Sequence, residues 1–320
     1  MIRVGIIGAA GYTAGELLRI LVNHPDVEIV FAHSSSNAGN RVCEVHSGLV
    51  GDTELCFSAD YDLNAVDVVF LCGGHGKSTE FWAQNERPSG LKVIDLAQDY
   101  RDESNGYVYG LPEINRERIR NCELLANPGC FATAIQLAVL PLAVAGLLSS
   151  EVNVTAITGS TGAGVKPGPT THFSWRNNNV SVYKAFGHQH LIEIGMNVRR
   201  LQPDYSESIN FVPVRGDFAR GILASLYVDS ELSAEEAIVL YENFYRDAAF
   251  THVFHSNVDL KQVVNTNKCL LSIEKHGSKL IINSVIDNLL KGASGQAVQN
   301  MNLMFGLDEK TGLRLKASAF

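Results

Sequence analysis

The chain has 320 residues, of which 46% are hydrophobic and 19% charged, a composition typical of a globular protein of about two domains. Its 34 acidic residues outnumber the 26 Lys and Arg, the net charge is −8, and no dense basic cluster occurs, which excludes nucleic acid as an expected partner. No uninterrupted apolar run reaches the roughly 18 residues of a membrane span, so no membrane association is expected.

The cysteine usage indicates a compartment. Six Cys are scattered without CxxC spacing, which favours a reducing environment over a disulfide or zinc framework. The sequence enters a strand pattern directly and shows no signal-peptide pattern. We therefore expect a cytoplasmic protein.

The first predicted element is a β-branched strand at residues 3–7. It ends in the small-residue turn 8–15, and residues 16–22 are apolar at helical spacing. Strand, glycine-rich turn and helix in this order are the phosphate-binding start of a Rossmann unit. The strict GxGxxG is absent, because Ile6 stands where the first glycine would be.

The second predicted strand, residues 27–32, runs into a hydroxyl-rich segment. An NAD-selective site often places an acidic residue here, but this chain has Ser34 and Ser36, with Arg41 nearby. Hydroxyls with an Arg suit the 2′-phosphate of NADP, which we predict over NAD. A solvated serine-rich loop is an equally weighted alternative.

Three further apolar runs, residues 66–72, 92–96 and 122–126, predict the central strands of a parallel sheet. Arg101 lies just beyond the second of them, where a guanidinium can hold a phosphate in bidentate fashion. Most Arg residues are only surface charges, which is the simpler interpretation of Arg101.

The third run leads into the segment that organises the prediction, Asn127-Pro128-Gly129-Cys130, which precedes an apolar run to Leu148. A tight turn followed by a buried helix, bent at Pro141, places Cys130 at a helix N-terminus. Backbone N–H groups and the helix dipole favour a thiolate there. A buried structural Cys is the alternative, but the position at a strand's carboxyl end favours a nucleophile.

The C-terminal half begins with a predicted strand, residues 151–158, and a loop, residues 159–168, that contains Ser160, Gly162 and Lys166. Small residues with free N–H groups plus a Lys suit an anionic substrate, while a mobile surface loop is the plain alternative. A long irregular segment, residues 170–184, follows.

The irregular segment ends at His188-Gln189-His190, with Glu193 at the start of a predicted helix. A reactive thiol needs a proton acceptor, and these imidazoles are the densest acid/base cluster after Cys130. Glu193 has the spacing to orient an imidazole. The HxH spacing also occurs in metal sites, but no further cluster completes a ligand set, so no metal is expected.

The remaining elements predict an α+β half. Strands at residues 208–212, 221–228, 269–275 and 279–286 accompany a helix with a capping box at Ser233–Glu236. Neighbouring strands without intervening helices predict a mainly antiparallel sheet, whose exposed face suits pairing of subunits. The predicted class is α/β, with an NADP-binding Rossmann domain at residues 1–147, completed by the C-terminal helix 288–320, and an α+β catalytic and dimerisation domain at 148–287.

Taken together, the chain resembles the N-acetyl-γ-glutamyl-phosphate reductases of arginine biosynthesis, within the aspartate-semialdehyde dehydrogenase superfamily, over nearly its whole length. The residues that carry this resemblance are Gly8–Thr13 with Glu16-Leu17, Asp95–Arg101, Tyr109–Glu113, Asn127–Cys130, the HxHxxE of His188–Glu193, and Lys291–Ala297.

The resemblance implies site residues. Cys130 would be the nucleophile and His188 the acid/base, supported by His190 and Glu193. NADPH would lie along Gly8, Ala10, Gly11, Tyr12, Thr13, Gly292, Ala293 and Gln296, and the phosphoryl group would contact Arg101 and the loop with Ser160 and Gly162. Asn127 and Lys166 are further candidates for substrate or phosphate binding. The segment 213–221 departs from the family pattern before Arg-Gly-Ile, so the contacts of the acyl group stay open.

The implied activity is NADPH-dependent reduction of an N-acyl-γ-glutamyl phosphate to the semialdehyde through a cysteine thioester, by a homodimer or homotetramer. Two alternatives stay open: an aspartate-semialdehyde dehydrogenase, and a non-enzymatic NADP-sensing protein on the same fold. The choice between N-acetyl and N-succinyl substrates is also open.

Overall fold

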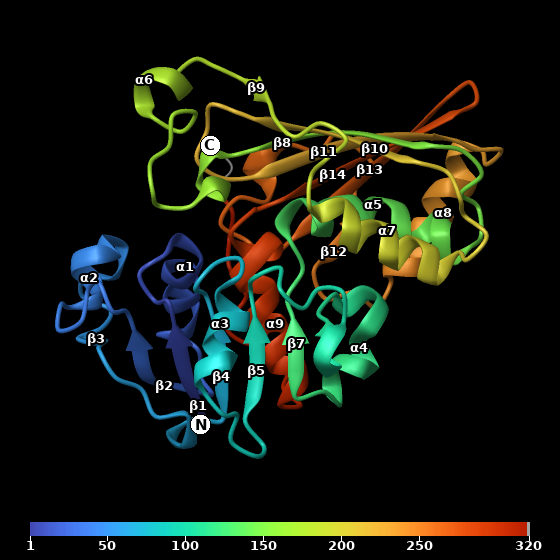
Figure 1. Ribbon diagram of the computed structural model, residues 1–320. Coiled ribbons are helices and arrows are strands. Elements are labelled where there is room, and N and C mark those ends of the chain that lie inside the picture. Colours follow the sequence, from blue (N-terminus) through green and yellow to red (C-terminus); the bar gives the residue numbers. More distant parts are fainter. Residues whose placement is uncertain (319–320) are drawn as a thin grey trace. The chain divides into compact units, whose positions relative to one another are not determined.

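The computed structural model describes residues 1–318. The chain forms two compact units (Figure 1). The first comprises Met1–Pro128 and Ala293–Arg314, and the second comprises Gly129–Gly292 with the described residues that follow Arg314. This division groups the helix that begins at Cys130 with the second unit, whereas the sequence-based boundary at residue 147 stays a prediction.

The first unit contains a seven-stranded parallel sheet, in the order β3-β2-β1-β4-β5-β7-β6. Its strands are β1 (Ile2–Ile7), β2 (Val27–His33), β3 (Phe57–Ser58), β4 (Val68–Leu71), β5 (Lys92–Asp95), β6 (Val108–Tyr109) and β7 (Leu124–Ala126). Its helices are α1 (Tyr12–Leu21), α2 (Val42–Val45), α3 (Lys77–Gln84), α4 (Pro112–Arg120) and α9 (Gly295–Met304).

The strand order reverses at β1, which pairs with β2 on one side and β4 on the other. Ligands of open parallel sheets bind at the carboxyl ends of the strands at such a reversal. The turns after β1 and β4 meet there: Gly8 has φ +79°, and a Cβ on it would lie 2.8 Å from the Gly73 nitrogen. Only glycine satisfies both the left-handed backbone and this approach.

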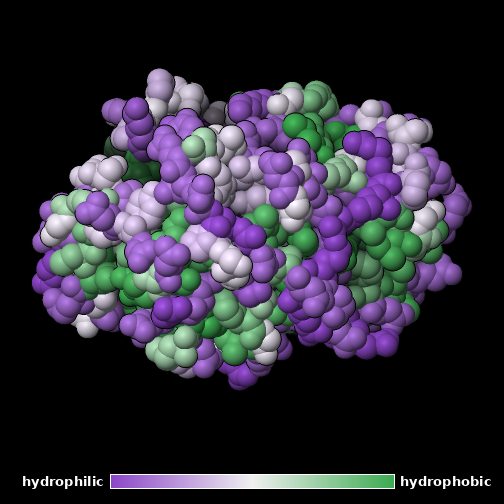
Figure 2. All heavy atoms as spheres, turned by 60° about the horizontal axis from the view of Figure 1, so that its bottom comes forward, coloured by the Kyte–Doolittle hydropathy of each residue, from purple (hydrophilic) through white to green (hydrophobic). Residues whose placement is uncertain are grey.

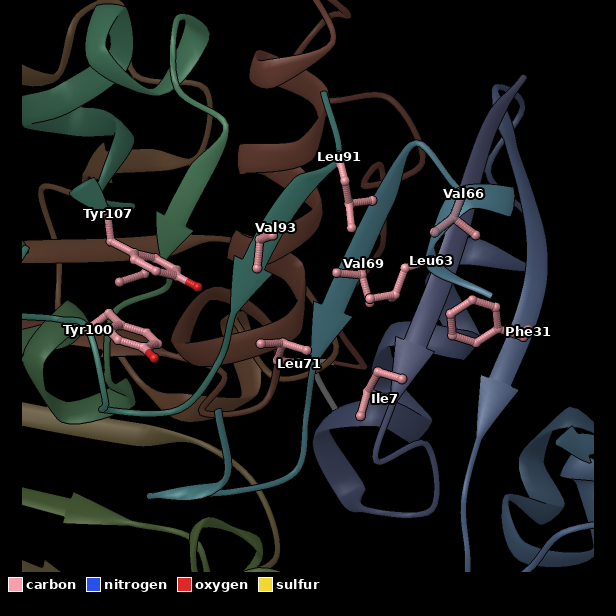
Figure 3. Packing of buried hydrophobic residues seen from close by; sticks show 11 residues of the cluster. Ile7, Phe31, Leu63, Val66, Val69, Leu71, Leu91, Val93, Tyr100 and Tyr107 are labelled. Atoms are coloured by element: carbon pink, nitrogen blue, oxygen red, sulfur yellow. The ribbon is translucent and has the colours of Figure 1, made fainter. Parts of the chain in front are cut away.

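A hydrophobic cluster in the core of the first unit combines strand side chains with side chains from the connecting segments (Figure 3). Val69 and Leu71 of β4 and Val93 of β5 are buried, because central parallel strands are covered on both faces. Tyr100 and Tyr107 stack with ring centroids 4.2 Å apart. Each buried aliphatic side chain contributes about 1.5–3 kcal/mol, so this cluster holds the sheet that supports the turns.

The second unit contains a mixed seven-stranded sheet, in the order β12-β13-β14-β11-β8-β10-β9. Its strands are β8 (Val152–Thr158), β9 (Ser181–Val182), β10 (Ile209–Arg215), β11 (Ile222–Asp229), β12 (Thr251–Val253), β13 (Cys269–His276) and β14 (Lys279–Ile286). Its helices are α5 (Cys130–Val144), α6 (Phe173–Arg176), α7 (His190–Leu201) and α8 (Ala234–Tyr245), and α5, α7 and α8 lie on one face of the sheet (Figure 1).

Helix α5 is held against α8 by two tyrosine hydroxyls. Pro141 has no N–H, so the Leu137 carbonyl loses its intrahelical donor. The Tyr245 hydroxyl of α8 donates to that carbonyl over 2.5 Å, and the Tyr241 hydroxyl donates to the Ala138 carbonyl, also over 2.5 Å. The proline within the apolar run is therefore compatible with a buried helix, since Tyr245 of α8 supplies the missing donor.

The predicted fold class is confirmed by the parallel first sheet and the α+β second unit. The capping box is present, with the Ser233 side chain bonded to the Glu236 amide and the Glu236 side chain to the Ser233 amide. Two pairings differ from the antiparallel expectation: β12 runs parallel to β13, and β10 runs parallel to β8. The chain returns from β8 to β10 through α7, and such a crossover makes a parallel pair.

No helix within residues 1–318 is long and apolar enough to cross a membrane. On the face that Figure 2 shows, hydrophilic and hydrophobic side chains are interspersed.

Candidate active site

Cys130 is the first residue of α5, as the sequence predicts. Gly129 occupies the N-cap with extended backbone angles and provides no side-chain cap. The amides of Phe131 and Ala132 point out of the helix start, and Gly129 has no side chain that could cap them. Cys130 is partly exposed, while residues 131–143 of the helix are buried. A sulfur with solvent access beside amide donors can attack a carbonyl and hold the resulting oxyanion.

Glu193 holds the segment that carries Cys130. Its buried carboxylate accepts a hydrogen bond from the Gly129 amide through Oε2 at 3.1 Å, and Oε1 lies 4.0 Å from His190 Nε2. The closer of these two contacts goes to the backbone before the nucleophile. Sequence spacing suggested that Glu193 orients an imidazole, and the structure adds that it also fixes the start of α5.

The two histidines gather around the residue that follows Cys130. The centroid of the Phe131 ring lies 5.5 Å from that of the His188 ring and 6.3 Å from that of the His190 ring. Both imidazoles are buried, at 5% and 6% exposure. The fold thus brings His188, which is distant from Cys130 in sequence, against the side chain next to the nucleophile.

A hydrogen bond from the His190 amide determines the tautomer of a neutral His188. This N–H donates to His188 Nδ1 at 3.2 Å, so a neutral His188 ring carries its proton on Nε2. Nε2 is therefore the ring atom through which His188 can donate a proton to a sulfur or to a leaving group.

Tyr183 is a site residue that the sequence did not single out. Its ring lies 5.9 Å from the His188 ring. Burial and then the charge of the Cys130 thiolate raise the pKa of Tyr183 to about 12, against a smaller lowering by Arg215. Tyr183 therefore adjoins both members of the proposed catalytic pair. It follows the short strand β9 at the end of an irregular segment, so no periodicity marks it in the sequence.

Gly292 lies against the nucleophile. A Cβ on Gly292 would be 2.9 Å from the Cβ of Cys130, closer than real Cβ contacts allow. The Gly292 amide donates to the Asp287 carbonyl at 2.9 Å within a π-helical turn, Leu290–Ser294. The family resemblance implies cofactor binding by Gly292, and the structure gives this glycine a steric reason of its own.

The loop after β8 carries the residues predicted for the phosphoryl group. Ser160 and Gly162 lie in a single 3₁₀ turn, and Lys166 is exposed beyond it. The expectation that this loop offers free N–H groups is wrong for its first amides. Those of Ser160 and Thr161 donate to the Phe218 and Ala219 carbonyls at 2.8 and 3.2 Å. The loop is therefore shaped by the segment after β10, and any anion contact must use other groups.

Two buried polar residues, Asp287 and Asn288, also bind this loop or the segment after β10. Asn288 accepts from the Gly221 amide at 2.7 Å and donates to Thr161 Oγ1 at 3.0 Å. Arg220 forms an ion pair with the buried Asp287 at 3.1 Å. These contacts connect residues from three parts of the sequence, which is why sequence spacing alone does not reveal them.

In the first unit, the predicted dinucleotide turn has an open helix start. Gly11 is the N-cap of α1 without a side-chain cap, and a Cβ added to it meets no atom of residues 1–318 within 4 Å. Ala10, Tyr12 and Thr13 flank it. The Ser294 hydroxyl donates to the Thr13 carbonyl at 2.7 Å, so the C-terminal segment with Ala293 and Gln296 adjoins this turn. Free N–H groups at a helix start fit a pyrophosphate.

The segment after β2 contains a hydroxyl network. Asn37 Nδ2 donates to Ser36 Oγ at 3.0 Å and to Ser34 Oγ at 3.4 Å. Ser34 is buried and Ser36 exposed, and Arg41 forms an exposed ion pair with Glu54. The hydroxyls fit a 2′-phosphate, whereas the Arg41 guanidinium must share its charge with Glu54.

Arg101 and Asn127 lie together in the first unit. The buried Arg101 donates through Nε to the Asn127 carbonyl at 2.9 Å and through Nη2 to the Leu96 carbonyl at 3.1 Å. Asn127 Nδ2 donates to the Ala293 carbonyl at 3.0 Å. The guanidinium therefore also ties the end of β5 to the end of β7, besides the phosphate role predicted for it.

Asp95, at the carboxyl end of β5, is an acid whose burial the sequence did not indicate. Oδ1 accepts from the Ser78 hydroxyl at 2.7 Å and from the Ala97 amide at 2.8 Å. Burial raises the pKa of Asp95 to about 6 despite these donors. The folded state therefore binds this proton more tightly than the unfolded chain does.

We expect this carboxyl to make the protein less stable as pH rises between about 4 and about 6, by about 3 kcal/mol in all. Asp95→Asn removes the titration, so its stability relative to wild type should be greater at pH 7.5 than at pH 4. Urea unfolding midpoints at both pH values measure this, with exposed Asp52→Asn as the matched control. A stability difference that is the same at both pH values would contradict the expectation.

Comparison with known proteins places this geometry in a class. Residues 3–122 match the family model described as semialdehyde dehydrogenase, NAD binding domain, and residues 130–288 match semialdehyde dehydrogenase, dimerisation domain. The chain belongs to the semialdehyde dehydrogenase family, and it is an oxidoreductase with a nicotinamide-nucleotide-binding domain.

Within that family, two similar curated proteins carry the same name. The N-acetyl-gamma-glutamyl-phosphate reductase of Azobacteroides pseudotrichonymphae is 59% identical, and that of Bacteroides thetaiotaomicron 58%, each over 100% of both chains. Among solved structures, aspartate semialdehyde dehydrogenase II from Vibrio cholerae has a TM-score of 0.75 at 19% identity, covering 96% of this chain and 98% of that one. This second likeness shows the fold alone.

Proposed function

We propose that this enzyme reduces an N-acyl-γ-glutamyl phosphate to the N-acyl-glutamate semialdehyde with NADPH, releasing phosphate, as a step of arginine biosynthesis. The observation that carries the proposal is the gathering of Cys130, His188, His190 and Glu193 about the start of α5, in a chain 59% identical to a full-length reductase of that name.

The mechanism begins at Cys130. Its thiolate attacks the acyl phosphate carbonyl, a C–S bond forms, and the C–O bond to phosphate breaks with its electron pair leaving on phosphate. The amides of Phe131 and Ala132 stabilise the oxyanion formed on the way. Glu193 keeps the Gly129 amide, and with it the helix start, in place.

The second half returns the enzyme to its starting state. A nicotinamide held along the turn at Gly8–Thr13 would supply the hydride that reduces the thioester on Cys130. The C–S bond then breaks to give the aldehyde and the thiolate, which the proton on His188 Nε2 stabilises. A thioester suits this step, because its carbonyl has less resonance stabilisation than that of an oxygen ester.

The reaction is tested most directly in reverse. Purified enzyme is mixed with NADP and phosphate, and NADPH absorbance is followed with N-acetylglutamate semialdehyde, its N-succinyl analogue or aspartate semialdehyde. We expect phosphate-dependent reduction with an acylglutamate semialdehyde. Preference for aspartate semialdehyde would favour the aspartate-semialdehyde dehydrogenase alternative, and NADP binding without turnover would favour the sensor.

We propose NADP as the cofactor, on the strength of the Ser34–Ser36–Asn37 network and the absence of an acidic residue at the end of β2. Ser36→Asp should raise the KM for NADP by about 10-fold or more, because a carboxylate repels the 2′-phosphate. The KM for NAD in the same variant is the internal control. Equal changes for both cofactors would contradict this assignment.

We further propose a homodimer formed through the sheet face of the second unit that α5, α7 and α8 do not cover. Tyr227 of β11 is 46% exposed there, and its cross-strand partner Ile281 is half-buried. The matched family description, dimerisation domain, supports this choice. Light scattering separates the dimer from a tetramer. The free cysteines support a reducing, cytoplasmic location.

A further inference from the structure

Arg215 ends β10 with its guanidinium beside an aromatic ring. The residue pairs in register with Thr158 of β8 and Ser181 of β9. Its guanidinium carbon lies 4.5 Å from the centre of the Tyr183 ring, within cation–π range. Its Nε is shielded from solvent and has no hydrogen-bond partner among the described residues. The described residues thus leave part of the hydrogen-bonding capacity of this guanidinium unfilled, which makes it a candidate for a ligand contact.

The surroundings of Arg215 are electropositive. Burial and then the charge of Arg215 lower the pKa of the neighbouring Arg176, against a smaller opposing effect of Asp217. The Arg176 guanidinium is already committed to backbone carbonyls, among them that of Arg215 at 2.7 Å. Arg215 is therefore the cation of this pair that keeps a donor unpaired within residues 1–318, its Nε, beside the hydrogen bond between its side chain and Tyr183.

One ring separates Arg215 from the catalytic pair. Tyr183 contacts the Arg215 guanidinium, its ring lies 5.9 Å from the His188 ring, and its pKa responds to the Cys130 thiolate. An acyl chain attached to Cys130 can extend past this ring toward Arg215. The remote end of the substrate, and not its reacting carbonyl, would reach the guanidinium.

We propose that Arg215 binds a carboxylate of the acylglutamyl substrate and sets the specificity of the enzyme for it. The proposal rests on the proposed function, because a glutamyl phosphate carries an α-carboxylate. Two methylene groups and the α-carbon separate this carboxylate from the reacting carbonyl. A dicarboxylic N-acyl group such as succinyl would supply a second carboxylate. Guanidinium binds either in bidentate fashion, a geometry that lysine does not reproduce.

The kinetic test compares Arg215→Gln and Arg215→Lys with wild type on the N-acetyl and N-succinyl semialdehydes. Arg215→Gln should raise KM by about 10- to 100-fold with little change in kcat, and Arg215→Lys should recover part of the loss. Equal increases in KM for both substrates would show that Arg215 binds the α-carboxylate. An increase in KM for the succinyl substrate alone would show that Arg215 binds the carboxylate of the acyl group. Unchanged KM for both substrates overturns the proposal. Exposed Arg246→Gln is the matched control.

A second readout does not need turnover. N-acetylglutamate and N-succinylglutamate should slow alkylation of Cys130 by iodoacetamide in the wild type, and this protection should be lost in Arg215→Gln. Equal protection in both proteins overturns the role of Arg215. The proposed function fails separately, if the wild type turns over neither semialdehyde while protection still depends on Arg215.

Discussion

Replacing Cys130 by serine is expected to lower kcat by more than about 10³-fold while NADPH binding survives. A serine hydroxyl is a far weaker nucleophile at neutral pH, and the oxygen ester it would form accepts hydride less readily. The substitution is nearly isosteric at the first position of α5, so the fold should be retained. Steady-state turnover and NADPH fluorescence titration measure the two properties.

Cys56→Ser is the matched control, since Cys56 is an exposed free cysteine in the first unit. It should turn over like wild type. Alkylation of the wild-type enzyme adds a second test. The Cys130 thiol should react rapidly, and bound substrate should slow this reaction. Turnover near the wild-type rate in Cys130→Ser would end the thioester mechanism and leave the sensor alternative.

Replacing His188 by glutamine is expected to lower kcat/KM by about 10²- to 10⁴-fold, the usual contribution of a general acid. Glutamine retains a polar side chain of similar reach but cannot exchange a proton near neutral pH. The pH–rate profile should also lose the limb that His188 contributes. His276→Gln, an exposed histidine at the end of β13, is the control and should leave the profile unchanged.

A pH profile in His188→Gln that keeps its shape at a moderately lower rate would assign the proton transfer to another group. His190 is the nearest alternative, because its ring centroid lies 4.5 Å from that of His188.

Local patterns in the sequence were sufficient for most elements. The helix start at Cys130 follows from Pro128-Gly129 and the apolar run, and the capping box at Ser233 follows from four residues. The resemblance to acylglutamyl-phosphate reductases is confirmed by the full-length relatives. These features depend on neighbours in the chain, which is why a sequence predicts them.

The contacts around the candidate site depend on tertiary pairing instead. The bond from the Gly129 amide to Glu193 joins two helices, and the approach of Arg215 to Tyr183 needs β9 to pair with β10. The commitment of the Ser160 and Thr161 amides likewise arises from the segment after β10. Neither residue type nor spacing encodes such partners, so candidate residues can be predicted from the sequence while their contacts cannot.

Gly292 has a consequence for how the molecule is connected. The chain leaves the first unit between Pro128 and Gly129 and re-enters it between Gly292 and Ala293. Cys130 is two residues past the outgoing crossing, and its Cβ abuts the glycine at the returning one. Whatever orientation the two units adopt, only one residue, Gly129, separates the nucleophile from the unit proposed to carry the nucleotide, and the nucleophile also contacts the glycine from which the chain returns to that unit.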